Sequence, residues 1–228
     1  MKPVRSITTQ AILGLATLGV ILWFALFLPA GSLDYWQGWM FWLIFMVCVT
    51  FISGYFMNKD SKLIDSRLKA GPIAEKEKDQ KIVQAFASIF FILLILIPSL
   101  DHRFQWSFVP VYLVGVGDVF IVLGLMIIFI VFRENSYTSG IIEVNKGQSV
   151  TSTGPYGVVR HPMYSGGLLM LLFIPLALGS FLGLIVFPLM LFVIAVRLLE
   201  EEKFLSKNLP GYDEYRERVR YRLVPYIW

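Results

Sequence analysis

Long apolar runs restrict the folds that this chain can adopt more than any other feature. Four such runs cover residues 10–28, 36–57, 82–100 and 109–132. Each has close to the roughly 20 residues that a helix needs to cross a bilayer. A fifth stretch, 163–196, is too long for one span, and Pro175, Gly179 and Gly183 interrupt it. Glycine and proline mark turns, so we expect a tight helical hairpin that turns near residues 179–183.

The composition supports the same class of protein. Hydrophobic residues make up 57% of the 228 residues and charged residues only 16%, and the mean hydropathy is +0.69. Soluble domains carry about 25% charged residues. We therefore predict an all-α integral membrane protein with about six transmembrane helices, followed by a C-terminal amphipathic helix. The first apolar run exceeds the 7–15 residues typical of a signal peptide, so we expect a retained span.

The distribution of basic residues predicts the orientation. If the N-terminus is cytoplasmic, nineteen of the twenty Lys and Arg residues fall on the cytoplasmic side and only Arg103 lies outside. Both termini and any active site are then cytoplasmic, in the inner membrane of a bacterium or an endomembrane of a eukaryote. The net charge of +4 predicts anionic lipid headgroups as partners and no nucleic acid. The oligomeric state stays open.

The stretch RHPMY at residues 160–164 predicts a helix start that can bind an anion. Pro162 suits the first helical position, which makes His161 the capping residue. The free backbone N–H groups of such a start favour a carboxylate or a phosphate. The alternative is that these residues anchor the helix to lipid phosphates, with Tyr156 and Tyr164 in the interfacial aromatic belt.

A second polar cluster, RLLEEEKFL, lies at the end of the last apolar run. Arg197 and Glu201 are four residues apart and share one helix face. Acidic residues at a helix C-terminus oppose the helix dipole, which favours a cationic partner or ligand for Glu201. The alternative is a solvated helix end that leaves the membrane. Asn135 ends the fourth apolar run on the same side. No cluster of Cys and His is present, so we predict no metal site.

Three blocks of the sequence match a known pattern in the same order: GPYGVVRHPMYSGG, RLLEEEKFL and PGYDEYRERVRYRLVP. Together they resemble the isoprenylcysteine carboxyl methyltransferase family, which is related to the phospholipid N-methyltransferases. The resemblance covers residues 133–228, so we expect a methyltransferase-like region there. Residues 1–132 form an N-terminal region of four transmembrane helices without a diagnostic motif. The resemblance implies an integral membrane enzyme that uses S-adenosyl-L-methionine.

The resemblance also implies which residues form the site. The cofactor-binding residues that it implies are Gln148, Ser149, Val150, Thr151, Tyr156, His161, Pro162, Met163, Tyr164 and Glu201. Arg197 and Glu201 are the expected catalytic residues, and Arg197 and Asn135 the expected substrate-binding residues. The cofactor has a carboxylate that suits the helix start at Pro162.

These residues favour a methyltransferase acting on a membrane lipid or a lipidated substrate. Carboxyl O-methylation comes first, because a guanidinium such as that of Arg197 binds a carboxylate well. N-methylation of an aminophospholipid is the alternative within the same class. A non-catalytic transporter or channel is the alternative of another class, although transporters keep their polar sites near the middle of the bilayer.

Overall fold

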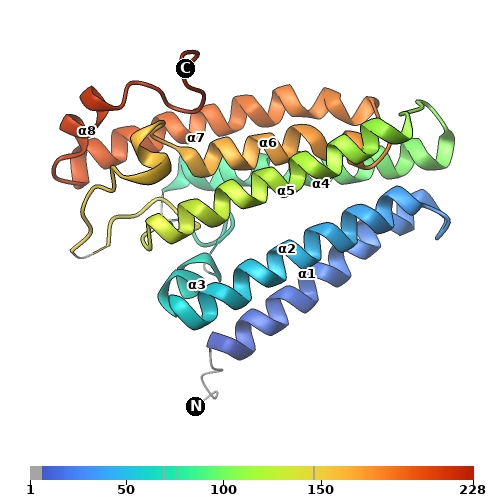
Figure 1. Cartoon of the computed structure of the whole chain (residues 1–228), viewed down its shortest axis with the longest axis horizontal. Helices are drawn as coiled ribbons and strands as arrows, with labels where there is room; N and C mark the ends of the chain where they lie inside the picture. Colours follow the sequence, from blue (N-terminus) through green and yellow to red (C-terminus); the bar gives the residue numbers. More distant parts are fainter. Residues whose placement is uncertain (1–6, 69, 76, 146) are drawn as a thin grey trace.

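Helices form most of the computed structural model, which describes residues 7–68, 70–75, 77–145 and 147–228 and contains no strand within them. The long helices are α1 (Ile7–Ala30), α2 (Trp36–Lys59), α4 (Lys78–Phe104), α5 (Val111–Glu134) and α7 (Val186–Asn208). The shorter ones are α3 (Ser61–Leu68), η1 (Gly154–Gly157), α6 (Pro162–Ala177), η2 (Leu182–Ile185) and α8 (Tyr212–Arg218). The long helices run side by side (Figure 1).

Among the described residues, five segments are long and apolar enough to cross a membrane: α1, α2, α4, α5, and η2 together with α7. The predicted all-α membrane class is therefore confirmed. The sixth predicted span is α6, which has 16 residues. At 1.5 Å per residue it is about 24 Å long, shorter than the roughly 30 Å hydrocarbon core.

The predicted hairpin between α6 and α7 is confirmed, and its turn has a specific backbone pattern. Gly179 has a positive φ of 76°, a conformation that glycine adopts without a steric penalty. Its N–H donates to the carbonyl of Leu176, and the N–H of Ser180 donates to the carbonyl of Pro175, both at 2.9 Å. This pair of bonds is the Schellman motif, which satisfies the last carbonyls of α6.

Glycines bring α5 and α6 unusually close together. A Cβ atom at Gly124 would lie 2.6 Å from the carbonyl oxygen of Gly166, and one at Gly117 would lie 2.6 Å from the backbone nitrogen of Ala177. Small residues at such contacts let two helices pack backbone against backbone. The end of α5 is thereby held beside the start of α6.

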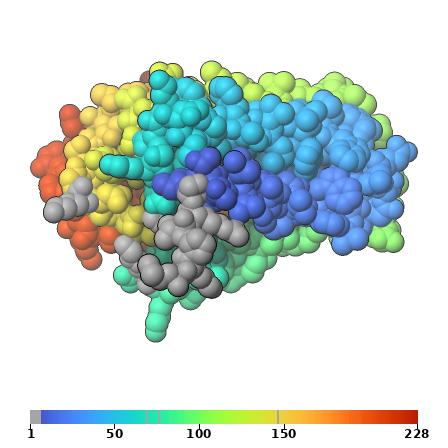
Figure 2. All heavy atoms as spheres, turned by 90° about the horizontal axis from the view of Figure 1, so that it is seen from below, coloured from blue at the N-terminus to red at the C-terminus, as the bar shows by residue number. Residues whose placement is uncertain are grey.

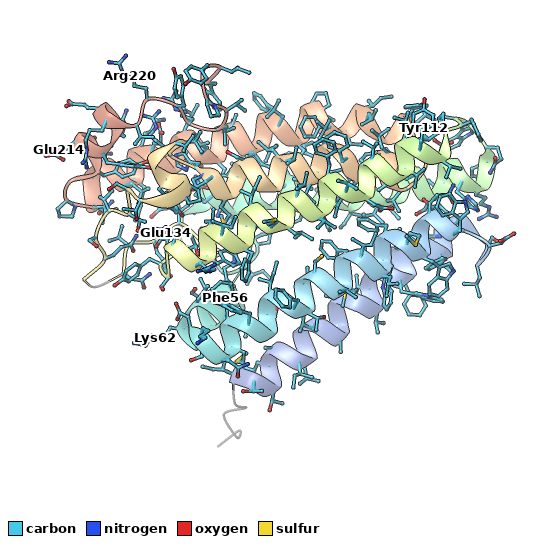
Figure 3. All side chains as sticks on the ribbon, viewed as in Figure 1. Phe56, Lys62, Tyr112, Glu134, Glu214 and Arg220 are labelled. Carbon is cyan, nitrogen blue, oxygen red and sulfur yellow. The ribbon has the colours of Figure 1, made fainter. Side chains whose placement is uncertain are left out.

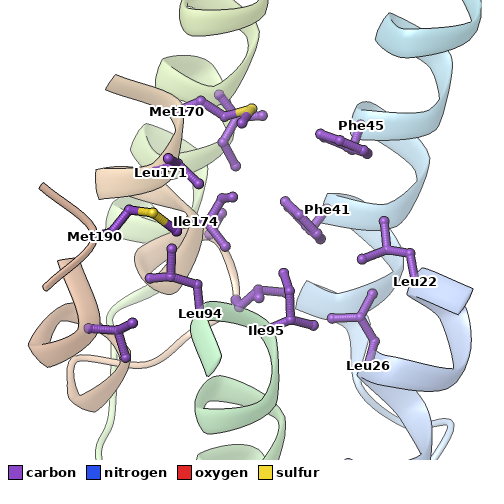
Figure 4. Packing of buried hydrophobic residues seen from close by; sticks show 14 of the residues in the cluster. Leu22, Leu26, Phe41, Phe45, Leu94, Ile95, Met170, Leu171, Ile174 and Met190 are labelled. Carbon is purple, nitrogen blue, oxygen red and sulfur yellow. The ribbon is translucent and has the colours of Figure 1, made fainter. Parts of the chain in front are cut away.

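The main core lies between the helices and contains side chains from α1, α2, α4, α5, α6 and α7. Figure 4 shows Leu22 and Phe41 of the first two helices facing Ile95 and Ile174 of the others. Many other apolar side chains point outward, including Phe51 and Phe192, which are 64% and 69% exposed. In a bilayer, lipid chains would cover these surfaces.

Charged side chains gather at one end of the helices. Figure 3 shows Lys62, Glu134, Glu214 and Arg220 at this end, which also carries α3 and α8, whereas Tyr112 lies at the opposite end. In Figure 2, α1 and α2 cover much of the face that is seen, and the yellow to red C-terminal part lies at one end. Five of the basic residues from which the orientation was predicted lie outside the described residues: Lys2, Arg5, Lys69, Lys76 and Lys146.

Parts of the segment between α2 and α4 are buried, although its composition is polar. Leu63 and Ile64 of α3 are buried against a second apolar cluster that includes Phe56 and Phe132. Further along this segment, Glu75 is only 3% exposed. This segment therefore contributes to the interior at the charged end of the molecule.

Candidate active site

A pocket opens at the charged end, where α5, η1, α6, α7 and α8 meet. Its empty volume is about 840 Å³, part of which is open to solvent. Its lining includes eleven of the predicted site residues: Asn135, Gln148, Val150, Thr151, Tyr156, His161, Pro162, Met163, Tyr164, Arg197 and Glu201. Residues up to 66 positions apart in the sequence thus meet in one cavity.

Ser149 is the predicted site residue that does not line this pocket. Its side chain is exposed, while Gln148 and Val150 on either side of it contribute to the lining. Successive side chains of an extended segment point in opposite directions. A direct side-chain contact from Ser149 to a ligand in the pocket is therefore not supported.

Tyr164 connects the two expected catalytic residues. Its hydroxyl donates to Oε2 of Glu201 at 2.7 Å and accepts a hydrogen bond from Nε of Arg197 at 3.1 Å. Tyr164 lies in the first turn of α6, whereas Arg197 and Glu201 lie one turn apart on α7. The spacing predicted that Arg197 and Glu201 share one face of α7, and the structure places a phenol from another helix in hydrogen-bond contact with both side chains.

Asn135 and Tyr156 form a second polar contact at the pocket wall. The side-chain amide of Asn135 donates to the hydroxyl of Tyr156 at 3.2 Å. The carbonyl of Tyr156 accepts a 2.8 Å hydrogen bond from the hydroxyl of Tyr215 in α8. Burial raises the pKa of Tyr156 to about 12, so its hydroxyl stays protonated at neutral pH and remains a hydrogen-bond donor.

His161 caps α6 as predicted, and Pro162 is the first helical residue. Its side chain makes no capping hydrogen bond. Instead, Nε2 lies 3.3 Å from Oε1 of Glu202. The N–H groups of Met163 and Tyr164 come too early in the helix to have intrahelical partners, and both residues line the pocket. The helix start therefore presents backbone donors to a ligand.

Glu202 is buried among three basic side chains. Besides His161, Nε of Arg222 donates to Oε2 at 3.0 Å, and Nε of Arg160 lies 2.9 Å from Oε1. The Arg160 contact is an ion pair whose angle does not fit a hydrogen bond. Backbone bonds from Arg160 to Tyr221 and from His161 to Arg222, both 2.9 Å, tie the same segments together. Glu202 thus fixes the C-terminal segment against the start of α6.

Apolar residues form the other end of the pocket. Leu209, Tyr212, Tyr215 and Val219 are buried in one cluster, with Val150 packed against it. This confirms the predicted amphipathic helix, whose buried face holds α8 against the segment that precedes η1. The pocket therefore has an apolar end and a polar end, which together suit a ligand with an aromatic ring and charged groups.

The comparisons with known proteins point to the same part of the chain. Residues 112–210 match the phospholipid methyltransferase family. The match runs from α5 to the end of α7 and covers somewhat under half of the chain. A comparison with curated proteins finds no similar sequence.

The phospholipid methyltransferase match contains the start of α6 and both ends of the Arg197–Tyr164–Glu201 connection. It supports a membrane methyltransferase acting on a lipid-like substrate. The predicted resemblance is confirmed through this related family, whereas the assignment to the isoprenylcysteine family itself stays a prediction. Residues Tyr212 and Tyr215 complete the pocket from just beyond the matched region.

Two side chains beside the site were missed by the sequence analysis. Gln80 and Glu75 both contact Arg197, at 3.3 and 2.6 Å. They lie in a run of charged residues, GPIAEKEKDQ, in which no periodic pattern distinguishes a buried carboxylate from a solvated one. Residue type and spacing could not predict these contacts, because the contacts depend on how α4 packs against α7.

Proposed function

We propose that the chain is an S-adenosyl-L-methionine-dependent membrane methyltransferase that acts on a lipid-like acceptor. One observation carries the proposal: the start of α6 and Glu201 of α7 face a single pocket, with Tyr164 joining them. The match of this region to the phospholipid methyltransferases supports it.

The pocket residues fit the cofactor group by group. The N–H groups at the start of α6 suit its carboxylate. Glu201 has one oxygen bound to Tyr164, and its second oxygen suits the ammonium group or another donor. The apolar end around Val150, Leu209 and Tyr212 suits the adenine ring. The cofactor supplies a methyl group already activated by its positively charged sulfur, so the protein has mainly to position the reactants and exclude water.

Carboxyl O-methylation is the acceptor chemistry that Arg197 favours from sequence. It requires the guanidinium to be available to the acceptor carboxylate. In the structure, however, Nη2 of Arg197 is paired with Glu75 at 2.6 Å. This pairing favours a second candidate, N-methylation of an aminolipid, which brings no negative charge to Arg197. The name of the matched family supports the second candidate as well.

We also propose that the site faces the cytoplasm. The spans predicted from the sequence assign nineteen of the twenty basic residues to the site's side, five of them outside the described residues. Basic residues concentrate on the cytoplasmic side of membrane proteins. A cytosolic cofactor would then reach the pocket from solvent, and a lipid acceptor would reach it from the bilayer.

The test has two parts. First, calorimetry with detergent-purified protein measures the binding of S-adenosylhomocysteine, the demethylated cofactor. We expect Glu201→Gln to weaken binding by about tenfold, the effect of losing one hydrogen bond to a charged group. His161→Ala should weaken binding as well, because His161 lines the pocket at the start of α6 and holds Glu202 there. Glu200→Gln is the matched control, because Glu200 is paired with Lys203 outside the pocket. Absence of binding to the unmodified protein in several lipids would rule out the proposal.

The second part identifies the acceptor group. Membranes containing the protein receive methyl-labelled cofactor, and the lipids are then extracted and treated with mild base. Label released by base as methanol indicates a methyl ester, whereas label that stays on the headgroup indicates a methylated amine. Arg197→Ala should reduce methylation with either acceptor, because it also removes a hydrogen bond to Tyr164. Unchanged methylation by this variant would exclude a role for Arg197.

A further inference from the structure

Glu75 is a buried carboxylate that reaches the site from a distant part of the chain. Its side chain is 1% exposed, and Oε1 lies 2.6 Å from Nη2 of Arg197. Its other oxygen accepts a hydrogen bond from the N–H of Ile142 at 3.4 Å. Glu75 precedes α4, whereas Ile142 precedes η1 and Arg197 belongs to α7. One carboxylate therefore joins three segments behind the pocket wall.

Protein groups also bind the other two nitrogens of Arg197. Nε donates to Tyr164 at 3.1 Å, Nη1 to Gln80 at 3.3 Å, and Nη2 to the carbonyl of Gly140 at 3.3 Å, in addition to Glu75. A guanidinium has five N–H groups, and the protein uses four hydrogen bonds here. Arg197 nevertheless lines the pocket. A ligand that approaches it meets a guanidinium whose positive charge is already balanced by Glu75.

A carboxylate ligand at Arg197 would have to lie next to the carboxylate of Glu75. Two like charges that share one site disfavour each other's ionised forms, and the burial of Glu75 strengthens this effect because solvent screens the pair poorly. Displacing Glu75 instead would leave a buried charge without a partner, which is unfavourable as well. Both routes therefore oppose the binding of a carboxylate.

We propose that Glu75 is a specificity-determining residue, which neutralises Arg197 and so excludes acceptors that carry a carboxylate at that point. The proposal rests on the proposed function, in which the acceptor binds at the Arg197 wall of the pocket. Glu75 does not itself line the pocket, so it acts on the acceptor through Arg197 and needs no contact with the cofactor.

The experiment compares two amphiphiles with the same chain length, lauric acid and dodecylamine, in binding to the full-length protein in detergent. We expect Glu75→Gln to bind lauric acid at least tenfold more tightly than the unmodified protein, with no such gain for dodecylamine. The matched control is Glu77→Gln, because Glu77 lies two residues away and is exposed. In the double variant Glu75→Gln, Arg197→Gln the gain should disappear. Equal lauric acid binding by Glu75→Gln and the unmodified protein would overturn the proposal.

The double variant also tests the proposal if Glu75→Gln alone does not fold, because it removes both charges of the buried pair together. We expect it to bind lauric acid as weakly as the unmodified protein does. Tighter binding by the unmodified protein would mean that Arg197 is available to carboxylates despite Glu75, and the proposal would be wrong. Lauric acid binding does not depend on the cofactor, so a failure to bind S-adenosylhomocysteine would count against the proposed function alone.

Discussion

The hydroxyl of Tyr164 donates a 2.7 Å hydrogen bond to Glu201. The same oxygen accepts from Arg197, so one phenol orients a carboxylate and a guanidinium on a neighbouring helix. Side chains that are oriented in advance of binding lose less conformational freedom when a ligand arrives. Tyr164 therefore belongs to the machinery of the pocket as much as the two charged residues do.

Tyr164→Phe tests this role. It removes the hydroxyl and leaves both Glu201 and Arg197 with one partner fewer, so we expect S-adenosylhomocysteine to bind about tenfold more weakly. Tyr226→Phe is the matched control, because Tyr226 is 88% exposed and lies outside the pocket. Calorimetry on both variants measures the difference. Equal affinities would show that the hydroxyl does not organise the site.

Glu202→Gln tests the anchoring of the C-terminal segment. Glu202 is 3% exposed and faces Arg160, His161 and Arg222. Removing one partner of a buried ionic cluster costs about 3 kcal/mol or more. We therefore expect a clear decrease in the apparent melting temperature in detergent, and little change for Glu200→Gln. A melting temperature unaffected by Glu202→Gln would contradict the structural role assigned to this carboxylate.

Replacement by alanine should have opposite effects at two glycines of α5. A Cβ at Gly124 meets backbone atoms of α6 at 2.6 Å, whereas a Cβ at Gly115 has no atom within 4 Å. Gly124→Ala should destabilise the protein by about 1–3 kcal/mol, because it forces two helices apart. Gly115→Ala should be neutral, or stabilising by up to about 1 kcal/mol, because alanine favours the helix. Thermal unfolding distinguishes the two, and similar shifts for both would argue against the close α5–α6 contact.

The proposed orientation can be tested by labelling cysteines. In a Cys48→Ser background, Lys62→Cys places a thiol at the charged end and Tyr112→Cys places one at the opposite end (Figure 3). A membrane-impermeant maleimide added to sealed vesicles of known orientation should label Lys62→Cys from the cytoplasmic face and Tyr112→Cys from the other. Labelling of both from one face would exclude the proposed topology.

The helices could be predicted well because their determinants are local. The apolar runs predicted the ends of α1, α2, α4 and α5, in most cases to within a few residues. Gly179 predicted the position of the hairpin turn. The short length of α6 was less evident, because its apolar composition continues into the turn. Pro162 and the Schellman motif at its other end set the limits of that helix.

The site was predictable to the extent that its residues lie at helix ends. His161, Tyr164 and Glu201 follow from the capping pattern, from helical spacing and from the resemblance to known methyltransferases. The direction in which His161 points did not follow, because Glu202 attracts its ring from another helix. Nor did the pairing of Arg197 with Glu75, which is 122 residues away in sequence and depends on tertiary packing alone.

The way in which the C-terminal segment completes the pocket has a consequence for biogenesis. Tyr212 and Tyr215 line the pocket, and the backbone of Tyr221 and Arg222 binds that of Arg160 and His161. A ribosome makes these residues after the long apolar helices α1, α2, α4, α5 and α7 and after α6. A nascent chain can therefore complete its insertion before it is able to hold a ligand, and binding competence arises only when the last segment folds back onto the start of α6.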